Sequence, residues 1–409
     1  MIDPSGEDVA DLSVRVVSTI AAVAAETWDR CANPVSLELT DPSEPRGERH
    51  NPFLSHAFLS ALEEAGCTGP RAGWQPVHVV VQKANGDVVG VAPTYIKSHS
   101  QGEYVFDQGW ADAYERAGGH YYPKIQVAVP FTPVTGRRLL VVDGPLGEAA
   151  ATALCAGLDA LRTQVKASSI HLTFLTKPEW DMLGERDYLQ RTDQQFHFIN
   201  DGYADFETFL AALASRKRKM IRRERKDALA NGITIEHVTG RDLTEAHWDA
   251  FYRFYMDTGA RKWGRPYLNR KFFSLIGQSM PERVLLVLAK RENRYIAGAI
   301  NFIGDDALYG RNWGAVEEHP FLHFEVCYYQ AIDFALSRGL ARVEAGAQGE
   351  HKLARGYRAV PTYSAHHIAD RRLAQAVSDY LERERAYAAD ALEAYAEHAP
   401  FRRPEPEQD

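Results

Sequence analysis

A pattern of two apolar strands joined by a short polar turn occurs twice in this chain. The first copy, HVVVQKANGDVVGVAPTYIKS, begins at His78, and the second, VLLVLAKRENRYIAGAINFIGDDALYGRNWG, begins at Val284. In each copy, apolar runs flank an Asn-Gly or charged turn, which is the sequence signal of a β-hairpin. A glycine recurs at matching positions, Gly90 and Gly298. The repeat predicts an internal duplication of one structural unit.

Each copy is followed by an amphipathic helix and then by another strand. In the first half, the expected helix covers Ala151–Val165 and the expected strand covers Ser169–Phe174. In the second half, the helix covers Phe324–Ser337 and the strand covers Arg342–Gly346. Helices that alternate with strands can pack on a sheet, which is typical of α/β units. The predicted fold class is mixed α/β (α+β), with two tandem units, each a mixed twisted sheet flanked by helices.

The length of the chain also favours two domains. It has 409 residues, and single hydrophobic cores stop growing at roughly 250–300 residues. We expect an N-terminal domain over 1–195, a C-terminal domain over 196–400 and a polar tail over 401–409. A long aromatic and Pro/Gly-rich insertion occupies 111–148. Loops of this length are usually binding elements.

Local signals predict further elements. NPFLSHAFLSALEEAG reads as a helix with Ser55 as N-cap, because the serine hydroxyl can accept from amides of the first turn. The other expected elements are a strand over Val14–Ile20, a helix over Ala21–Cys31, a strand ending in YVFDQGW, a helix over about Asp205–Ala230 and a closing helix over Arg371–Ala399.

The composition is that of an ordinary globular protein, with 45% hydrophobic and 25% charged residues. Its cysteines, Cys31, Cys67, Cys155 and Cys327, form no CxxC pair, which argues against a zinc cage or a disulfide framework. The N-terminus lacks a signal pattern, and no stretch reaches the roughly 18 apolar residues of a membrane span. We therefore expect a cytoplasmic protein without a transmembrane segment or a bound metal.

Basic residues are concentrated in one segment. RKRKMIRRERK, at 216–226, holds eight basic residues and one acidic residue, although the net charge of the chain is −8. Such a segment attracts polyanions, and on a helix its side chains can contact consecutive phosphates. An RNA acceptor stem or a lipid diphosphate fits this charge; a solvated helix with local ion pairs is the alternative. The expected phosphate- or nucleic-acid-binding residues are Arg216, Lys217, Arg218, Lys219, Arg222 and Arg223.

Polar residues also gather where the last predicted strand of the second half ends. EAGAQGEHKLARGY begins at Glu344, and ligands of open α/β sheets bind at such strand ends. Glu344 is a candidate general base, because an ammonium must lose a proton before it attacks a carbonyl. The alternative is that these residues only cap a helix and hold a turn. The expected substrate-binding residues here are Gln348, His351, Lys352 and Arg355.

Two strand tips carry further candidates. In YGRNWG, Arg311 can hold a carboxylate or phosphate bidentately beside Trp313. In YVFDQGW, Asp107 can receive a cationic amine beside Trp110. Hydrogen bonds that merely anchor these loops are the alternative.

The remaining candidates are a lysine in the insertion and the residues of FLHFE. Lys124 with Tyr122 can grip an acidic ligand, or else belongs to aromatic packing under the loop. His323 and Glu325 can each shuttle protons, but without further ligands they make no joint metal site. The catalytic candidates are therefore Glu344, His323, Glu325 and Arg311, whereas His171 and His197 are expected to be structural.

These motifs together resemble one known family. The chain is similar to the FemAB-like family of acyl-CoA N-acyltransferase relatives. Four segments carry this similarity: NPFLSHAFLSALEEAG, the run from SHSQGEYVFDQGW through VTGRRLL, SRKRKMIRRERK, and EAGAQGEHKLARGYRAV. The resemblance covers nearly the whole chain and implies two tandem GNAT-like domains. It also implies an acyltransferase, kin to the Fem enzymes that move an amino acid from aminoacyl-tRNA to an amine of a peptidoglycan precursor.

The resemblance leaves two donors open, aminoacyl-tRNA and acyl-CoA, and implies no bound cofactor. The acceptor it implies is an amine-bearing small molecule or a peptidoglycan-precursor-like molecule. Typical GNAT enzymes hold the CoA pyrophosphate on a Gly-rich loop at a helix N-terminus. GRNWGAVEEHPFLHFE lacks that glycine spacing and contains acids, which disfavours CoA in the second domain. A direct attack, with Arg311, Lys352 or backbone amides stabilising the oxyanion, is favoured over an acyl-Cys327 route. A non-catalytic binder of nucleic acid or anionic lipid is the alternative from another class.

Overall fold

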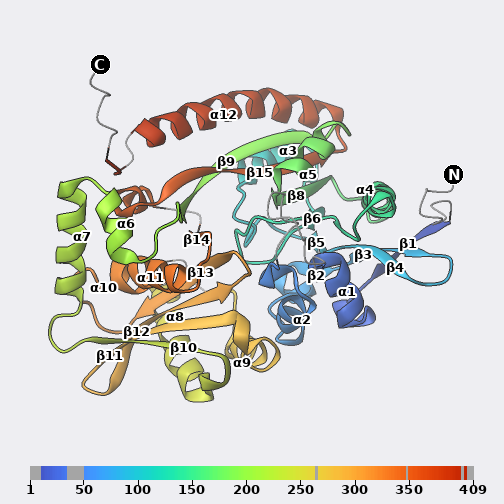
Figure 1. The fold of residues 1–409 in the computed structure, drawn as a ribbon. Helices are drawn as coiled ribbons and strands as arrows, with labels where there is room; N and C mark the ends of the chain where they lie inside the picture. Colours follow the sequence, from blue (N-terminus) through green and yellow to red (C-terminus); the bar gives the residue numbers. More distant parts are fainter. Residues whose placement is uncertain (1–10, 35–49, 263–265, 347–348, 398–399, 403–409) are drawn as a thin grey trace. The chain divides into compact units, whose positions relative to one another are not determined.

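The structure is a computed structural model that describes residues 11–34, 50–262, 266–346, 349–397 and 400–402. The chain forms two compact units (Figure 1). Unit 1 contains the residues up to Asp193 together with Thr362–Ala388, and unit 2 contains Gln194–Pro361 and the remainder from Ala389. The chain passes from one unit to the other within single elements, namely β9 (Leu189–Ile199), β15 (Arg358–Ile368) and α12 (Arg371–Glu397).

This division differs from two contiguous domains over 1–195 and 196–400, because Thr362–Ala388 belongs to the first unit. The reason is a long-range strand pairing: Tyr363–Ile368 of β15 pairs antiparallel with β8 (Ser169–Leu175). Leu373, Val377 and Leu381 of α12 then join a cluster around Trp110. Local sequence patterns carry no signal for such a return of the chain.

Unit 1 contains two sheets. In the first, the strand order is β1-β3-β4-β7; the second runs from the end of β15 through β8, β6 and β5 to β2. Its only parallel pair among the described residues is β6 with β8. The elements are β1 (Leu12–Val17), α1 (Ala25–Ala32), α2 (His56–Glu64), β2 (Trp74–Pro76), β3 (His78–Lys83), β4 (Val88–Ala92), β5 (Thr94–Lys97), α3 (Gln108–Arg116), β6 (Lys124–Val127), β7 (Leu140–Val141), α4 (Pro145–Gln164), β8 and α5 (Lys177–Gly184).

Unit 2 contains one mixed sheet in the order β10-β11-β12-β13-β14-β9. β10 to β13 are antiparallel, and β13 pairs parallel with β14. The elements after β9 are α6 (Phe206–Ala212), α7 (Ser215–Ala228), β10 (Thr234–Thr239), α8 (Glu245–Lys262), α9 (Arg270–Ser279), β11 (Val284–Arg291), β12 (Arg294–Ile303), β13 (Ala307–Ala315), α10 (Leu322–Phe324), a π-helical turn (Glu325–Tyr329), α11 (Gln330–Ser337), β14 (Arg342–Glu344) and a 3-10 turn (Glu350–Arg355).

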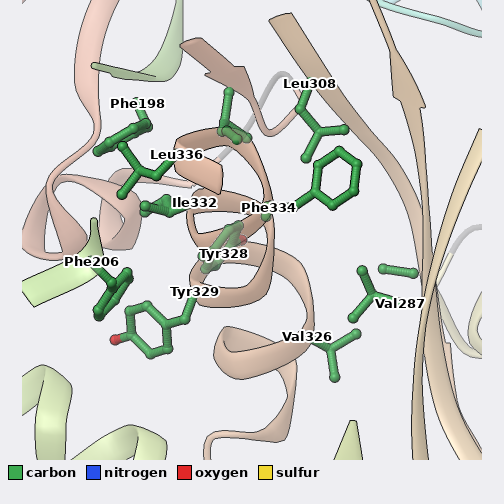
Figure 2. Packing of buried hydrophobic residues seen from close by; sticks show 14 of the residues in the cluster. Phe198, Phe206, Val287, Leu308, Val326, Tyr328, Tyr329, Ile332, Phe334 and Leu336 are labelled. Atoms are coloured by element: carbon green, nitrogen blue, oxygen red, sulfur yellow. The ribbon is translucent and has the colours of Figure 1, made fainter. Parts of the chain in front are cut away.

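The hydrophobic core of unit 2 lies between this sheet and the helices that follow β9 and β13. Val326 of the π-helical turn lies beside Val287 of β11, and Phe334 of α11 lies beside Leu308 of β13 (Figure 2). On the other side of these helical turns, Phe206 of α6 packs against Tyr329. In unit 1, a second core joins α4 to β3, β6 and β8. Burial of these apolar side chains supplies the main driving force for each unit.

Both predicted hairpins are confirmed as β3–β4 and β11–β12, and Gly90 and Gly298 lie on the second strand of each. Ser55 is confirmed as the N-cap of α2, since its Oγ accepts from the amide of Phe58 at 3.3 Å. The closing helix is present as α12. No helix in the part of the chain that the structure describes has the length and apolarity needed to cross a membrane.

Two predicted elements were wrong, and two others are present with different bounds. YVFDQGW is no strand: Asp107 precedes α3, because Glu103 and Asp107 turn inward to meet buried lysines. The expected strand over Val14–Ile20 ends at Val17, and α1 begins only at Ala25.

The second wrong element is the helix expected over 205–230, which is broken at Leu213 and Ala214. Both residues are extended. The amide of Ala214 donates to the carbonyl of Pro400, and the amide of Arg402 donates to Ala212. The break is therefore caused by pairing with a segment distant in sequence, and it separates the basic helix α7 from α6.

Candidate functional site

The parallel strands of unit 2 part near their carboxyl ends. β13 pairs with β14 only over Ala307–Tyr309 and Arg342–Glu344. β14 ends at Glu344, whereas β13 continues to Ala315. The register of β13 with β12 also shifts between Ala299 and Asn301, where β13 carries one extra residue. This divergence is the place where an open α/β sheet can admit a ligand.

Glu344 lies at this divergence and is 1% exposed. Arg342 donates to its Oε1 at 3.1 Å, and Arg311 lies 3.8 Å from its Oε2. Burial raises the pKa of Glu344, but the charges of His197, Arg342 and Arg311 outweigh burial and hold it below the usual value. A carboxylate held ionised in this way is a weak base, so the contacts favour a role in positioning Arg311 over the expected proton transfer.

Lys352 is the second charged group at the end of β14. It is 1% exposed, and its Nζ donates to the carbonyls of Ala345 at 2.6 Å and Gly346 at 3.0 Å. Burial, against the opposing effect of Cys327 and with a smaller contribution from the charge of Arg311, lowers the pKa of Lys352 to about 8. An ammonium has three protons. Since the carbonyls of Ala345 and Gly346 accept two of these protons, the third proton can be directed at a ligand.

An aromatic cluster stands beside Lys352, whose Nζ lies 6.0 Å from the ring centroid of Tyr328. The Tyr328 hydroxyl is 2.9 Å from Nε2 of His351, and the His323 ring lies 5.3 Å from that of Tyr328. His351 is exposed, and its pKa is lowered by partial burial and by the nearby charges of Arg355 and Lys352. Tyr328 projects from the π-helical turn, and such turns are frequent at functional sites.

Arg355 is buried away from any described pocket. Its guanidinium donates to both carboxylate oxygens of Glu224 on α7 and lies 3.4 Å above the centroid of Phe324. Tyr329 also donates to Glu224. These contacts join α7 to the turn that carries Lys352. Arg355, predicted to bind substrate, therefore has contacts that hold two elements of the fold together. Gln348, another expected substrate contact, lies outside the described residues.

Glu325 is fully buried and does not share a site with His323. It accepts from Arg225 at 3.0 Å and from Gln330 at 2.7 Å. Arg225 also binds Asp333 at 2.6 Å. Arg225 of the basic segment therefore holds α7 against the π-helical turn. Glu325, predicted to transfer protons, is the buried ion-pair partner of this arginine.

The other basic residues of α7 face solvent to different degrees. Arg216, Lys219, Arg222 and Arg223 are exposed, whereas Lys217 and Arg218 are half-buried. Arg222 pairs with Glu207, and Arg223 with Asp227 at 3.4 Å. Exposed pairs of this kind are worth little and are easily exchanged for a ligand. Four of the six residues expected to bind phosphate are therefore exposed on α7, and part of their charge is locally neutralised.

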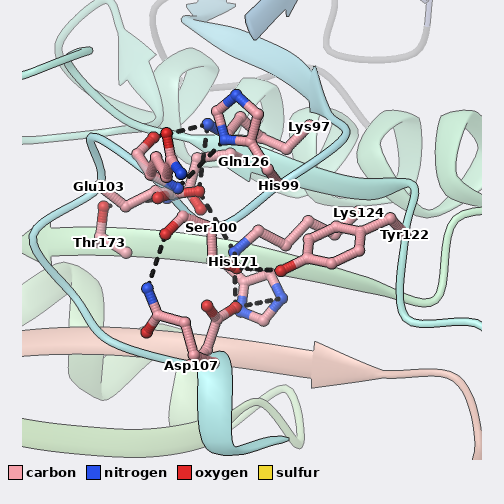
Figure 3. A network of polar contacts seen from close by, with 12 residues as sticks. Lys97, His99, Ser100, Glu103, Asp107, Tyr122, Lys124, Gln126, His171 and Thr173 are labelled. Carbon is pink, nitrogen blue, oxygen red and sulfur yellow. Dashed lines mark hydrogen bonds and ion pairs between the residues drawn. The ribbon is translucent and has the colours of Figure 1, made fainter. Parts of the chain in front are cut away.

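The expected substrate contacts of the first half lie in a buried polar network of unit 1 (Figure 3). The Nζ of Lys124 lies 2.5 Å from Oδ2 of Asp107, and the Tyr121 hydroxyl donates to the same oxygen at 2.7 Å. Asp107 is 3% exposed and Lys124 is 1% exposed. Tyr122 bonds Ser100 at the edge of the network.

Trp110 is also buried, with its ring centroid 5.0 Å from that of His366. These four expected contacts are therefore placed in the interior of unit 1, where the polar groups bind one another.

Further polar side chains extend the network. Glu103 lies 3.3 Å from both Lys97 and Lys124. Burial lowers the pKa of Lys97 to about 7, against the opposing charge of Glu103. Nδ1 of His171 lies 2.7 Å from Nδ1 of His366. Burial lowers the pKa of His171 to about 3 and that of His366 well below its usual value, so both imidazoles are neutral at pH 7.

We expect the stability of unit 1 to fall between pH 7 and pH 5 because of these histidines. Their folded-state pKa values are lower than those of the unfolded chain, so below about pH 6.5 only the unfolded state takes up protons. The urea midpoint of the whole chain should decrease over this range. His366→Asn should make the slope shallower by up to one proton, and an unchanged slope would contradict this assignment.

Two pockets lined by described residues open on unit 2. One of about 480 Å³ lies at the end of β13 and is lined by Thr258, Trp313, Ala315, Glu317, Glu318, His319, Leu322 and His323. We call it the His323 pocket. The other, of about 530 Å³, shares Glu317 with it and is lined by Asp249, Ala250, Arg253, Asn293, Arg294, Tyr295, Ile296, Val316 and Glu317. Sequence reasoning noted the acids after β13 but missed Thr258 of α8, which only the fold brings there.

Comparisons with known proteins agree with this architecture. The model of the FemAB-like family, described as peptidoglycan biosynthesis and recognition, matches residues 19–403. Among solved structures, FemX has 14% identity and a TM-score of 0.52, covering 87% of this chain and 98% of its own. L-PGS from Bacillus licheniformis has 9% identity and a TM-score of 0.49, with coverages of 82% and 98%.

A tandem GNAT protein from the clavulanic acid biosynthesis pathway has 11% identity and a TM-score of 0.44, covering 88% of this chain and 99% of its own. No curated protein matches the sequence. The likeness to FemX shows the fold, and the family model spans nearly the whole chain. The chain therefore belongs to the FemAB-like family and has the fold of FemX.

Proposed function

We propose that this chain transfers an acyl or aminoacyl group to an amine, with the chemistry in unit 2 where β13 and β14 part. The observation that carries this proposal is Lys352, a buried cation at the carboxyl end of β14 with one ammonium proton available. A buried cation fixed by backbone carbonyls needs no reorganisation to meet a developing negative charge, and such preorganised groups lower transition-state energy.

In the proposed reaction, the neutral amine of the acceptor attacks the acyl carbon of an ester or thioester donor. A carbon–nitrogen bond forms, and the carbonyl oxygen becomes an oxyanion that Lys352 stabilises. The tetrahedral intermediate then collapses, the bond to the leaving oxygen or sulfur breaks, and the proton from the attacking nitrogen passes to the leaving group. His351, neutral at pH 7 and exposed beside Lys352, is the proposed proton carrier, and Glu344 positions Arg311.

Aminoacyl-tRNA is the donor that α7 supports. The helix presents several cations to solvent, and phosphate contacts dominate the affinity of proteins for nucleic acids. The loop after β13 gives less support to acyl-CoA, because Glu317 and Glu318 line the pocket at the start of α10. Acyl-CoA remains the second donor to test. The acceptor we propose is an amine-bearing small molecule or a peptidoglycan-precursor-like molecule.

The test is a mass-spectrometric search for a new amide. The pure chain is incubated with charged tRNA pools, or with acyl-CoA pools, and a mixed amine library. An amide that forms only with charged tRNA supports the proposal as stated. One that forms only with thioesters moves the chain to acyl-CoA chemistry. If neither forms while labelled tRNA still binds, a non-catalytic nucleic-acid binder replaces the proposal.

Reversing the charge of two exposed α7 residues should weaken binding of tRNA. We expect Arg216→Glu/Lys219→Glu to lower affinity at least tenfold and to reduce the slope of log K against log salt by about two phosphate contacts. Arg71→Glu/Lys166→Glu changes the net charge equally at exposed positions of unit 1 and is the control. Equal losses in both double variants, measured by filter binding from 50 to 300 mM salt, would show that only net charge matters.

A further inference from the structure

The His323 pocket has a charge opposite to that needed for phosphate. It lies at the start of α10, directly after β13, and backbone amides at a helix start favour anions. Two carboxylates, Glu317 and Glu318, line it instead. Among the described residues, its lining contains neither lysine nor arginine. A phosphate group placed there would face two like charges.

The charge of Glu317 is fixed in place. Its Oε2 lies 3.0 Å from Nε2 of His319 and 3.0 Å from Nε of Arg291. The hydrogen bond from His319 and the contacts with Arg291 hold the pKa of Glu317 below its usual value. Glu317 therefore stays ionised at neutral pH, and it cannot turn away from the pocket without losing these partners.

Aromatic side chains also line the pocket. The rings of Trp313 and His323 lie 5.2 Å apart, and Leu322 adds an apolar side chain. The Oγ1 of Thr258 is buried without a hydrogen-bond partner among the described residues. Aromatic rings and carboxylates in one pocket favour organic cations, because ring faces and carboxylates both attract positive charge.

We propose that the His323 pocket binds a primary ammonium group of the substrate. The pocket is linked to the proposed reaction site, on which this inference rests, through His323. This ring contacts Trp313 on the pocket side and Tyr328 at 5.3 Å on the side of Lys352. The ammonium is either the amino group of an aminoacyl donor or the acceptor amine.

Calorimetric titration of the whole chain distinguishes these sources. The probes are L-alanine methyl ester, which carries an ammonium beside an acyl carbon, cadaverine, which has only ammonium groups, and N-acetyl-L-alanine methyl ester, which has none. Selective binding of the amino ester assigns the pocket to an aminoacyl donor. Comparable binding of cadaverine assigns it to the acceptor. Binding of the N-acetyl ester as tight as that of the amino ester would overturn the proposal.

Two neutral variants test the carboxylates. Glu317→Gln and Glu318→Gln should each weaken binding of the amino ester or diamine about tenfold, the scale of one charge-assisted hydrogen bond. Glu292→Gln, at an exposed turn of unit 2, is the matched control. Unchanged affinity in both pocket variants, absence of any binding, or displacement of the probe by inorganic pyrophosphate would each overturn the assignment.

These titrations need no turnover. If the chain binds the ammonium probes through the two carboxylates but forms no amide, the pocket assignment is supported and the proposed function is contradicted. If the chain forms amides and the rates are unchanged in Glu317→Gln and Glu318→Gln, the proposed function is supported and the pocket assignment is contradicted.

Discussion

Replacing Lys352 by methionine should lower the turnover number for amide formation by roughly 10²–10³-fold, the loss seen when one preorganised oxyanion donor is removed. The side chain is 1% exposed, so methionine fills nearly the same buried space. The carbonyls of Ala345 and Gly346 lose their donor, which should cost about 1–3 kcal/mol of stability. The measurement is kcat under single-turnover conditions, beside a thermal melt of the same preparation.

A second substitution separates charge from folding. Lys352→Arg keeps a cation that does not titrate below pH 12. Because the pKa of Lys352 is about 8, the wild-type rate should decline above that pH as the ammonium loses its proton. In the arginine variant this alkaline decline should disappear, and part of the rate should return. Lys290→Met, which removes a lysine from a surface pair with Glu236, is the control. A Lys352→Met variant that folds and retains its rate would remove Lys352 from the mechanism.

The repeated hairpins could be predicted from sequence because all the information for them is local. Apolar runs, an Asn-Gly turn and matching glycines identify β3–β4 and β11–β12 without reference to distant residues. The same holds for the N-cap of α2. The family resemblance is confirmed by the match over 19–403.

Elements fixed by distant partners could not be predicted in this way. Neither Leu213 nor Ala214 is a helix-breaking residue such as glycine or proline. They interrupt a helix because residues 400–402 pair with this part of the chain. β15 returns to unit 1 through its pairing with β8. Asp107 was expected at a strand tip as a contact for an amine, but its partner is Lys124 within the protein. Charge alone cannot tell a ligand contact from an internal ion pair.

The candidate site shows the same limit. The segment after β14 was recognised as polar and placed at a strand end, and these features follow from sequence. Which residue has which environment depends on packing. Glu344 is surrounded by arginines, and Arg355 is bound to Glu224. Lys352, expected only to bind substrate, is the buried cation with a lowered pKa. The proposed roles changed because burial and neighbouring charges decide the chemistry of each group.

The buried network of unit 1 gives the largest expected effect on stability. Asp107→Asn removes one of two carboxylates that neutralise Lys97 and Lys124, so the interior retains two lysines with Glu103 alone. Breaking a buried ion pair on one side typically costs about 3–5 kcal/mol, because the remaining charge is desolvated without compensation. We expect a loss of this size in urea unfolding of the whole chain at pH 7, reported by a probe in unit 1.

The matched control is Asp181→Asn, which breaks the exposed pair of Asp181 with Lys177 on α5 and should cost less than about 1 kcal/mol. The double variant Asp107→Asn/Lys124→Met removes both charges. It should recover much of the loss, because a neutral interior carries no uncompensated lysine. If the single and double variants were equally unstable, the loss would come from the hydrogen bond of Tyr121 to Asp107 and not from charge.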